Sequence, residues 1–308
     1  MNKDKFKHGE ELFCPGHRAC PGCGAALTSK LVTEATGPKT ILSMPTGCME
    51  VTTTPYPESA WGISWIHNIF ENSAAVAGGI ETAYKSFSKR GKEGYMDYED
   101  VNFVVLAGDG ATFDIGIRSL SGMMERGHDV LYICYDNEAY MNTGIQRSSS
   151  TPIGAATTTS PAGKESFGEN IHKKDMPSIA AAHGLRYVAT ASVAYPEDFK
   201  KKINKALETE GPKYIQVFAP CPRGWKHESK NTIDIARLAV ETGLYPIFEL
   251  EDGQLTNVRK IKDRKPVEEY LKAQGRFKHL FKKDGGGEVV ENIQKIADMN
   301  AERIGIDK

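Results

Sequence analysis

The sequence carries little net charge and contains no long hydrophobic run. Its 308 residues include 39 Lys and Arg and 40 Asp and Glu, which leaves a formal charge of -1 at pH 7. This balance provides no basic patch for nucleic acid, so we expect no nucleic-acid partner. No apolar stretch approaches the roughly 18 residues that a membrane span needs, and residues 1–7 lack the apolar core of a signal peptide. We therefore expect a cytoplasmic protein without membrane contact.

Cysteine is also scarce, with six residues in the whole chain. Six are too few for a disulfide framework in a protein of this length. In a cytoplasmic protein, clustered cysteines instead indicate a metal or redox site. The chain is 40% hydrophobic and contains 30 Gly and 15 Pro, a composition typical of a globular protein with a sizeable core.

Short apolar runs predict five buried strands. They lack the polar alternation of a half-exposed sheet, which favours a parallel sheet covered on both faces. The predicted strands are 40–44, 101–107, 130–135, 186–190 and 214–218. Helical patterns lie at 25–36, 71–87, 115–125, 178–183, 196–208, 267–271 and 289–300. Strands that alternate with helices predict a doubly wound α/β fold with a mostly parallel sheet.

The remaining segments define the expected domain organisation. Residues 148–163 are rich in Ser, Thr, Pro and Gly, and they predict a long functional loop. Beyond residue 225 the helical pattern weakens, and a run of glycines at 285–287 separates the last two predicted helices. We expect a single domain over residues 1–308, in which 226–308 form a C-terminal extension that packs on the domain or contacts a partner.

A phosphate-binding and metal-binding pattern follows two of the predicted strands. Gly108, Asp109 and Gly110 come directly after one strand, and Asn137 follows the next. Ligands of open parallel sheets bind beyond the carboxyl ends of the strands. Gly108 and Gly110 allow close backbone approach to phosphate oxygens, and the helix that follows offers free N–H groups. Asp109, Asn137 and the Ala139 carbonyl supply the oxygens that Mg²⁺ prefers. Taken alone, Gly-Asp-Gly is also an ordinary tight turn.

The extended pattern resembles a known family. Gly108-Asp109-Gly110 followed by Asn137 resembles the thiamine-diphosphate signature, and the runs 114–116 and 136–144 resemble the ferredoxin-dependent 2-oxoacid oxidoreductases. The resemblance implies a thiamine-diphosphate-binding fold in which Asp109, Asn137 and Ala139 hold Mg²⁺. It implies cofactor contacts from Gly47, Gly108, Asp109, Gly110, Ala111, Asn137, Ala139, Tyr140, Asn142 and Thr143.

The resemblance implies a catalytic role for Asn142. In this role its side chain would face the thiazolium ring and the substrate, and its amide would stabilise charge as that charge develops. The alternative for this residue is structural, because Asn also suits the positive-φ turn that precedes Gly144.

Four of the cysteines form a second pattern. Cys20 and Cys23 make a Cys-x-x-Cys pair, and Cys48 and Cys221 stand alone further along the chain. Four thiolates are the usual ligands of a [4Fe–4S] cluster, and we expect Gly22, Gly24 and Gly47 to leave room for it. A Cys₄ zinc site or a redox-inert pair is the alternative. The resemblance favours the cluster, because Thr46-Gly47-Cys48 and Cys221-Pro222 match the family. Cys14 and Cys134 are predicted to be bystanders, the latter as a small buried hydrophobe.

The likeness covers nearly the whole chain, since 266–271 and 274–277 also match the family. It implies the β subunit of a multi-subunit enzyme of the pyruvate:ferredoxin oxidoreductase type, with α, γ and δ-type subunits and ferredoxin as partners. The implied reaction converts pyruvate or a related 2-oxoacid and CoA into acyl-CoA, CO₂ and reduced ferredoxin. The glutamate that bonds the aminopyrimidine ring is implied to come from another subunit.

Two alternatives stay open at this point. Ser64 stands where pyruvate-acting relatives often have Pro, which leaves another 2-oxoacid such as 2-oxoisovalerate or oxalate as the substrate. The second alternative is an iron-free thiamine decarboxylase with a structural zinc site.

Overall fold

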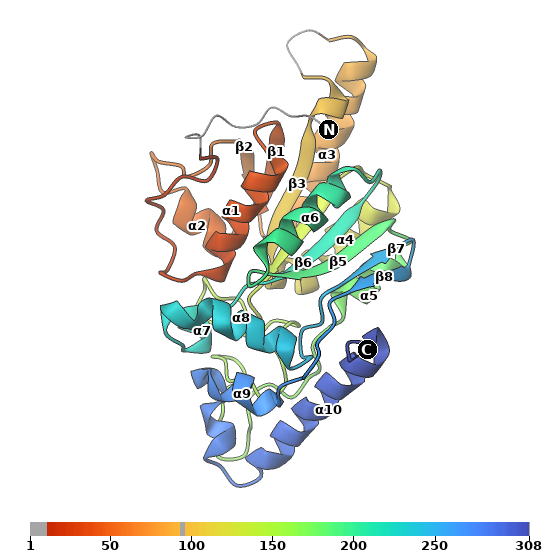
Figure 1. Cartoon of the computed structure of the whole chain (residues 1–308). Helices are drawn as coiled ribbons and strands as arrows, with labels where there is room; N and C mark the ends of the chain where they lie inside the picture. The colour runs from red at the N-terminus through yellow and green to blue at the C-terminus, as the bar shows by residue number, and fades with distance from the viewer. Residues whose placement is uncertain (1–10, 93–95, 308) are drawn as a thin grey trace.

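A computed structural model describes residues 11–92 and 96–307 and is built around one eight-stranded sheet (Figure 1). The strand order is β2-β1-β3-β4-β6-β5-β7-β8. The strands are β1 Thr40–Pro45, β2 Ser64–Asn68, β3 Asn102–Gly108, β4 Leu131–Asp136, β5 Tyr187–Ser192, β6 Lys213–Phe218, β7 Phe248–Glu251 and β8 Gln254–Val258. All pairs from β2 to β5 are parallel, and β7 and β8 join as antiparallel strands at one edge. The predicted mostly parallel α/β sheet is confirmed.

Helices cover both faces of this sheet. The helices are α1 Gly24–Thr36, α2 Cys48–Thr53, α3 Ser73–Lys89, α4 Ile117–Glu125, α5 Met176–Ala182, α6 Pro196–Leu207, α7 Pro222–Trp225, α8 Thr232–Glu241, α9 Val267–Lys272 and α10 Gly286–Ile304. Residues of α1 and α6 join the buried cluster on one face, and residues of α3, α4 and α5 join the cluster on the other. In the described part of the chain, none of the helices combines the length and hydrophobicity needed to cross a membrane.

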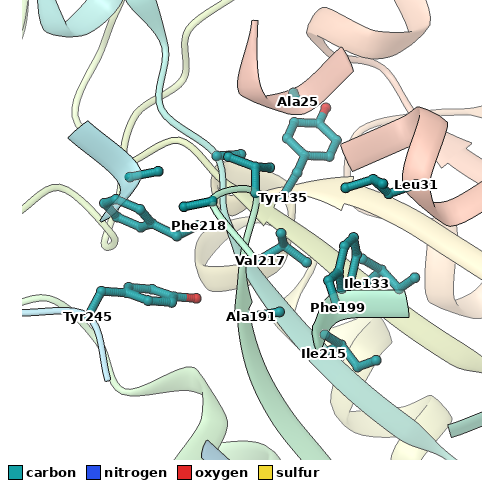
Figure 2. Packing of buried hydrophobic residues seen from close by; sticks show 14 of the residues in the cluster. Ala25, Leu31, Ile133, Tyr135, Ala191, Phe199, Ile215, Val217, Phe218 and Tyr245 are labelled. Carbon is teal, nitrogen blue, oxygen red and sulfur yellow. The ribbon is translucent and has the colours of Figure 1, made fainter. Parts of the chain in front are cut away.

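Successive side chains of β4 point to opposite faces of the sheet. This explains why the sequences of the buried strands are continuous apolar runs. Ile133 and its neighbour Cys134 are both fully buried, yet they belong to clusters on opposite faces, because successive strand residues point to opposite sides. Figure 2 shows Ile133 with Phe199 of α6 and Leu31 of α1 in one of these clusters. A strand buried on both faces needs apolar residues at every position.

Several element predictions differ from the structure. The sequence did not predict β2, because its pattern is mixed and most of its residues are exposed. The α8 helix and the β7–β8 hairpin were also missed, although their apolar positions are spaced as expected for short amphipathic elements. The predicted helix at 115–125 begins at Ile117, because residues Gly110–Asp114 form a wider π-type turn. The helix predicted from residue 71 begins at Ser73.

The segment after residue 225 packs onto the main core. Apolar residues of α8, α9 and α10 share the buried cluster that contains α1 and α6. The β7–β8 hairpin extends the sheet beyond β5. The C-terminal extension therefore lies against the carboxyl edge of the sheet, where it can influence the turns that leave the central strands.

Candidate active site

Four neighbouring strands deliver the predicted site residues to one edge of the sheet. β1, β3, β4 and β6 are adjacent and parallel, so their carboxyl ends lie side by side. Cys48 follows β1, Asp109 follows β3, Asn137 follows β4 and Cys221 follows β6. The two inner strands supply the phosphate and metal motif, and the two outer strands supply cysteines.

A small cavity of about 120 Å³ lies at this edge. All ten residues that the resemblance assigns to the cofactor line it. They are Gly47, Gly108, Asp109, Gly110, Ala111, Asn137, Ala139, Tyr140, Asn142 and Thr143. Thr46, Cys48, Phe70, Tyr135 and Met141 also line the cavity without having been assigned to the cofactor. Phe70 stacks on Tyr140 with a centroid separation of 5.6 Å, and no sequence motif marks that contact.

Three polar groups meet at one side of this cavity. One terminal atom of the Asn137 amide lies 2.9 Å from Asp109 Oδ1 and 2.9 Å from the Ala139 carbonyl oxygen. A rotated amide would place an N–H group there and make two hydrogen bonds. The unrotated amide gives the oxygen cluster that a small divalent cation needs, since ligands about 2.1 Å from an octahedral Mg²⁺ lie about 3 Å apart. Asp109, Asn137 and Ala139 can therefore hold such a cation.

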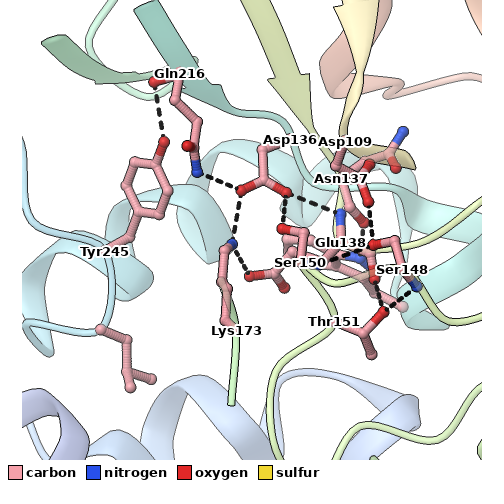
Figure 3. A network of polar contacts seen from close by, with 12 residues as sticks. Asp109, Asp136, Asn137, Glu138, Ser148, Ser150, Thr151, Lys173, Gln216 and Tyr245 are labelled. Carbon is pink, nitrogen blue, oxygen red and sulfur yellow. Dashed lines mark hydrogen bonds and ion pairs between the residues drawn. The ribbon is translucent and has the colours of Figure 1, made fainter. Parts of the chain in front are cut away.

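Asp109 sits in an environment that favours a bound cation. Its side chain is 1% exposed, and burial followed by the nearby Asp136 raises the pKa of its carboxyl well above the usual range. The Ser148 hydroxyl donates a hydrogen bond to Asp109 (Figure 3). A cation beside the carboxylate would offset both the burial and the repulsion.

Buried ion pairs hold Asp136 and Glu138, the two residues that flank Asn137 (Figure 3). Lys173 Nζ lies 2.6 Å from Asp136 Oδ2 and 2.9 Å from Glu138 Oε1. Arg276 Nη2 lies 2.6 Å from Glu138 Oε2, and the Gln216 amide donates to Asp136 at 2.8 Å. Burial opposes charge on Glu138, but Lys173 and Arg276 outweigh it and lower the pKa of its carboxyl. Sequence reasoning missed Lys173 and Arg276 because they come from distant segments.

The four predicted cysteines gather beside the cofactor cavity. The Cys23 N–H donates to the Cys20 carbonyl at 3.1 Å, and the Gly24 N–H donates to the Pro220 carbonyl at 3.1 Å. Cys221 accepts a hydrogen bond at Sγ from the Gly224 N–H at 3.3 Å. These contacts bring the Cys-x-x-Cys turn to the segment that follows β6.

Electrostatic repulsion also acts among the side chains of the four cysteines. Burial and then repulsion from Cys221, Cys23 and Cys20 raise the pKa of Cys48 to about 12. Burial, with repulsion from Cys23 and Cys20, raises the pKa of Cys221 to about 11. Within residues 11–92 and 96–307, no group of three or more His, Cys, Asp or Glu side chains is arranged so that it could hold a metal ion.

The glycines near the cysteines serve backbone packing. A Cβ atom on Gly24 would lie 2.7 Å from the Ala219 carbonyl carbon, and one on Gly22 would lie 2.4 Å from the Ser229 carbonyl oxygen. Close packing thus accounts for these two glycines, and the expectation that they also leave room for a cluster stays a prediction. They allow the Cys-x-x-Cys turn to approach the chain beyond β6, which is how residues far apart in sequence come together.

A larger cavity of about 700 Å³ lies between the sheet and α10. Most of its lining is apolar, with Lys173, Gln216 and Tyr245 among the polar residues. None of the predicted cofactor residues or cysteines lines it. The converging oxygens lie instead in the smaller cavity, so the chemistry of the site belongs there.

Comparisons with known proteins show the family to which the chain is similar. The family described as "Thiamine pyrophosphate enzyme, C-terminal TPP binding domain" matches residues 45–217. The chain is 54% identical over 297 residues to pyruvate synthase subunit PorB of Methanocaldococcus jannaschii, covering 96% of this chain and 97% of that protein. It is 58% identical over 271 residues to the PorB subunit of Methanothermobacter thermautotrophicus, covering 88% and 91%.

Two further similarities broaden the comparison. Ketoisovalerate oxidoreductase subunit VorB of Pyrococcus abyssi is 51% identical over 290 residues, covering 93% of this chain and 90% of that protein. The solved structure of 2-oxoglutarate:ferredoxin oxidoreductase from Magnetococcus marinus has a TM-score of 0.53 at 22% identity, covering 75% of this chain and 82% of that one. This last similarity concerns the fold.

Proposed function

We propose that this chain, which belongs to the family of thiamine-diphosphate-dependent 2-oxoacid:ferredoxin oxidoreductase subunits, holds the cofactor diphosphate through Mg²⁺ and carries a [4Fe–4S] cluster. The reaction is the oxidative decarboxylation of a 2-oxoacid with CoA to give acyl-CoA, CO₂ and reduced ferredoxin. The observation that carries the proposal is the meeting of the Asp109 carboxylate, the Asn137 amide and the Ala139 carbonyl in the cavity lined by the predicted cofactor residues.

The residues of the cavity have distinct roles in this proposal. Asp109, Asn137 and Ala139 would hold a Mg²⁺ that neutralises the charge of the diphosphate, and Gly108 and Gly110 would permit close approach of the phosphate oxygens. Asn142 is exposed at the rim, where its amide can hydrogen-bond the substrate oxygen. When bound, the cofactor supplies the electron sink for decarboxylation and the cluster accepts single electrons.

The proposed cluster ligands are Cys20, Cys23, Cys48 and Cys221. Burial, and then repulsion from neighbouring cysteines, raises the pKa values of Cys48 and Cys221, and a positively charged iron core would offset both effects. Cys48 also lines the cofactor cavity, so a cluster bound there would lie within a short distance of the cofactor. A Cys₄ zinc site would use the same thiolates, and metal analysis distinguishes the two.

Another subunit completes the site in this proposal. A cavity of about 120 Å³ is smaller than the roughly 300 Å³ that small-molecule sites usually offer. Ile66, Ile69 and Ile115 are exposed by 42%, 59% and 51%, which suits burial by a partner chain. Relatives at 54% identity are named as subunits. We propose that α, γ and δ-type subunits assemble with this chain and that ferredoxin receives the electrons.

Pyruvate is the proposed substrate, because the relatives at up to 58% identity are pyruvate synthase subunits. A branched 2-oxoacid such as 2-oxoisovalerate is the second candidate, because a ketoisovalerate oxidoreductase subunit is 51% identical. Much of the substrate pocket would lie in the partner subunit, so the two candidates share the site described above.

The test uses the complex purified without oxygen after coexpression of all its subunits. We expect bound thiamine diphosphate, about four iron atoms per cluster of this chain, and reduction of ferredoxin that requires both pyruvate and CoA. Activity is compared with 2-oxoisovalerate, 2-oxoglutarate and oxalate. Zinc without iron in this chain, or no ferredoxin reduction with any of the four acids, would contradict the proposal.

A further inference from the structure

The turn between the two proposed metal ligands has an unusual backbone. Glu138 lies between Asn137 and Ala139 and has φ of 65°, in the left-handed region that non-glycine residues rarely adopt. It is 4% exposed, and it lines the larger cavity and not the cofactor cavity. Such a conformation persists only where the surroundings hold it.

Arg276 is one of the groups that hold this turn. It is 2% exposed, and its Nη2 atom lies 2.6 Å from Glu138 Oε2. Its Nε atom donates a hydrogen bond to Gln274 Oε1 at 2.9 Å, and its Nη2 atom donates one to the Tyr270 hydroxyl at 3.2 Å. A buried arginine with this many partners has one defined position, so it fixes the Glu138 side chain.

Trp225 holds the same turn through the backbone. Its indole N–H donates a hydrogen bond to the Asn137 carbonyl at 2.8 Å. The guanidinium carbon of Arg276 stacks 3.9 Å from the centre of the Trp225 ring. Trp225 is the last residue of α7. Its backbone N–H donates a hydrogen bond to the carbonyl of Cys221, which precedes that helix. The Arg276–Trp225 stack therefore links the turn that contains Asn137 and Ala139 to the segment that carries Cys221.

We propose that the Arg276–Trp225 stack is a positioning device that locks the Asn137–Ala139 turn to α7. This inference rests on the proposed function, and it adds that the C-terminal segment sets the geometry of the cofactor site. Neither residue lines the cofactor cavity, so both act through the turn. The device also fixes the spacing between the Mg²⁺ ligands and Cys221.

The experiment measures cofactor binding by the complete complex. Metal-free complex is titrated with Mg²⁺ at saturating thiamine diphosphate by calorimetry, for the parent and for W225F, R276M and R276K. Loss of the indole donor in W225F is expected to raise the half-saturating Mg²⁺ concentration roughly tenfold. R276M is expected to raise it at least tenfold, and R276K is expected to recover part of that loss because it restores the charge.

Control measurements separate positioning from general destabilisation. R303M removes a half-exposed arginine of α10 that pairs with Asp175, and it should bind Mg²⁺ like the parent. Iron content and the unfolding temperature of the cofactor-free complex should stay at parental values in W225F and R276K. Half-saturation in W225F and R276M equal to that of R303M would overturn the inference alone. A parent complex that takes up no thiamine diphosphate would overturn the proposed function as well.

Discussion

The ring of Tyr140 lies directly against the backbone of Gly110, and its hydroxyl donates a hydrogen bond to the Gly110 carbonyl at 3.2 Å. A Cβ atom at Gly110 would lie 2.4 Å from Tyr140 Cε1. Both residues line the cofactor cavity. The glycine is thus needed for the packing of a neighbouring aromatic ring as well as for approach to a phosphate.

The first prediction follows from that contact. G110A should displace Tyr140 and weaken thiamine diphosphate binding at least tenfold, a loss of about 1.4 kcal/mol or more in binding free energy. Calorimetric titration of the complex with the cofactor measures it. G79A is the matched control, because a Cβ atom there meets nothing within 4 Å, and Ala in a helix should stabilise by about 0.5–1 kcal/mol. Equal cofactor affinity in both variants would refute the role of Gly110.

The second prediction separates the two proposed metal sites. D109A removes one of the three converging oxygens and should abolish retention of thiamine diphosphate through purification. Iron content should remain at the parental level, since Asp109 is not among the proposed cluster ligands. Cofactor and iron are both measured on the same sample. Parallel loss of both would mean that the two sites are misplaced or that the chain has unfolded.

The third prediction concerns the cysteines. C48A and C221A should each reduce bound iron from about four atoms per chain toward zero, because a [4Fe–4S] cluster needs four thiolates. C14A is the control, since Cys14 is not among the proposed ligands and its thiol donates to the Glu11 carbonyl at 3.4 Å. Iron and sulfide analysis of anaerobically purified protein provides the measurement. If C14A lost iron while C48A retained it, the assignment of ligands would be wrong.

The fourth prediction concerns acid stability far from the site. Burial opposes charge on Glu81, but hydrogen bonds from Lys85, His128 and Tyr98 outweigh it and lower its pKa from 4.5 to about 2. A lowered pKa in the folded state stabilises the protein above pH 4.5, and that contribution is lost as the pH falls toward 2. Its size is on the order of 1–3 kcal/mol.

E81Q should therefore lower the free energy of unfolding at pH 7 and flatten its decline below pH 4.5. Urea unfolding of the cluster-free full-length chain at several pH values measures both effects. E197Q is the control, because the Glu197 side chain is 77% exposed in its pair with Lys200, and such pairs contribute little. An E81Q curve parallel to the parent down to pH 2 would contradict the prediction.

The sequence was sufficient to predict the part of the site that lies at the carboxyl ends of the strands. Asp109 and Asn137 each follow a run of buried apolar residues, and neighbouring parallel strands end at the same edge. Their convergence could thus be expected before the structure was known. The family resemblance then placed Tyr140 and Asn142 in the same cavity, where the structure also has them.

Sequence reasoning failed where support comes from distant or irregular segments. Lys173 lies in a long loop and Arg276 in a short helical turn, and neither position carries a periodic signal. Their importance depends on burial beside Glu138, which no local pattern reveals. The edge strand β2 was missed for a related reason, because exposed edge residues need not be apolar.

The order of strands has a consequence for how the protein matures. Sulfur donors flank the diphosphate turns on both sides, with Cys48 after β1 and Cys221 after β6, while β3 and β4 lie between them. During synthesis, a nascent chain in which β6 has not yet been translated contains only three of the four proposed cysteine ligands. Under the proposed assignment of ligands, all four sulfurs are therefore present only once translation has passed Cys221, while β7 and β8 still have to join the sheet.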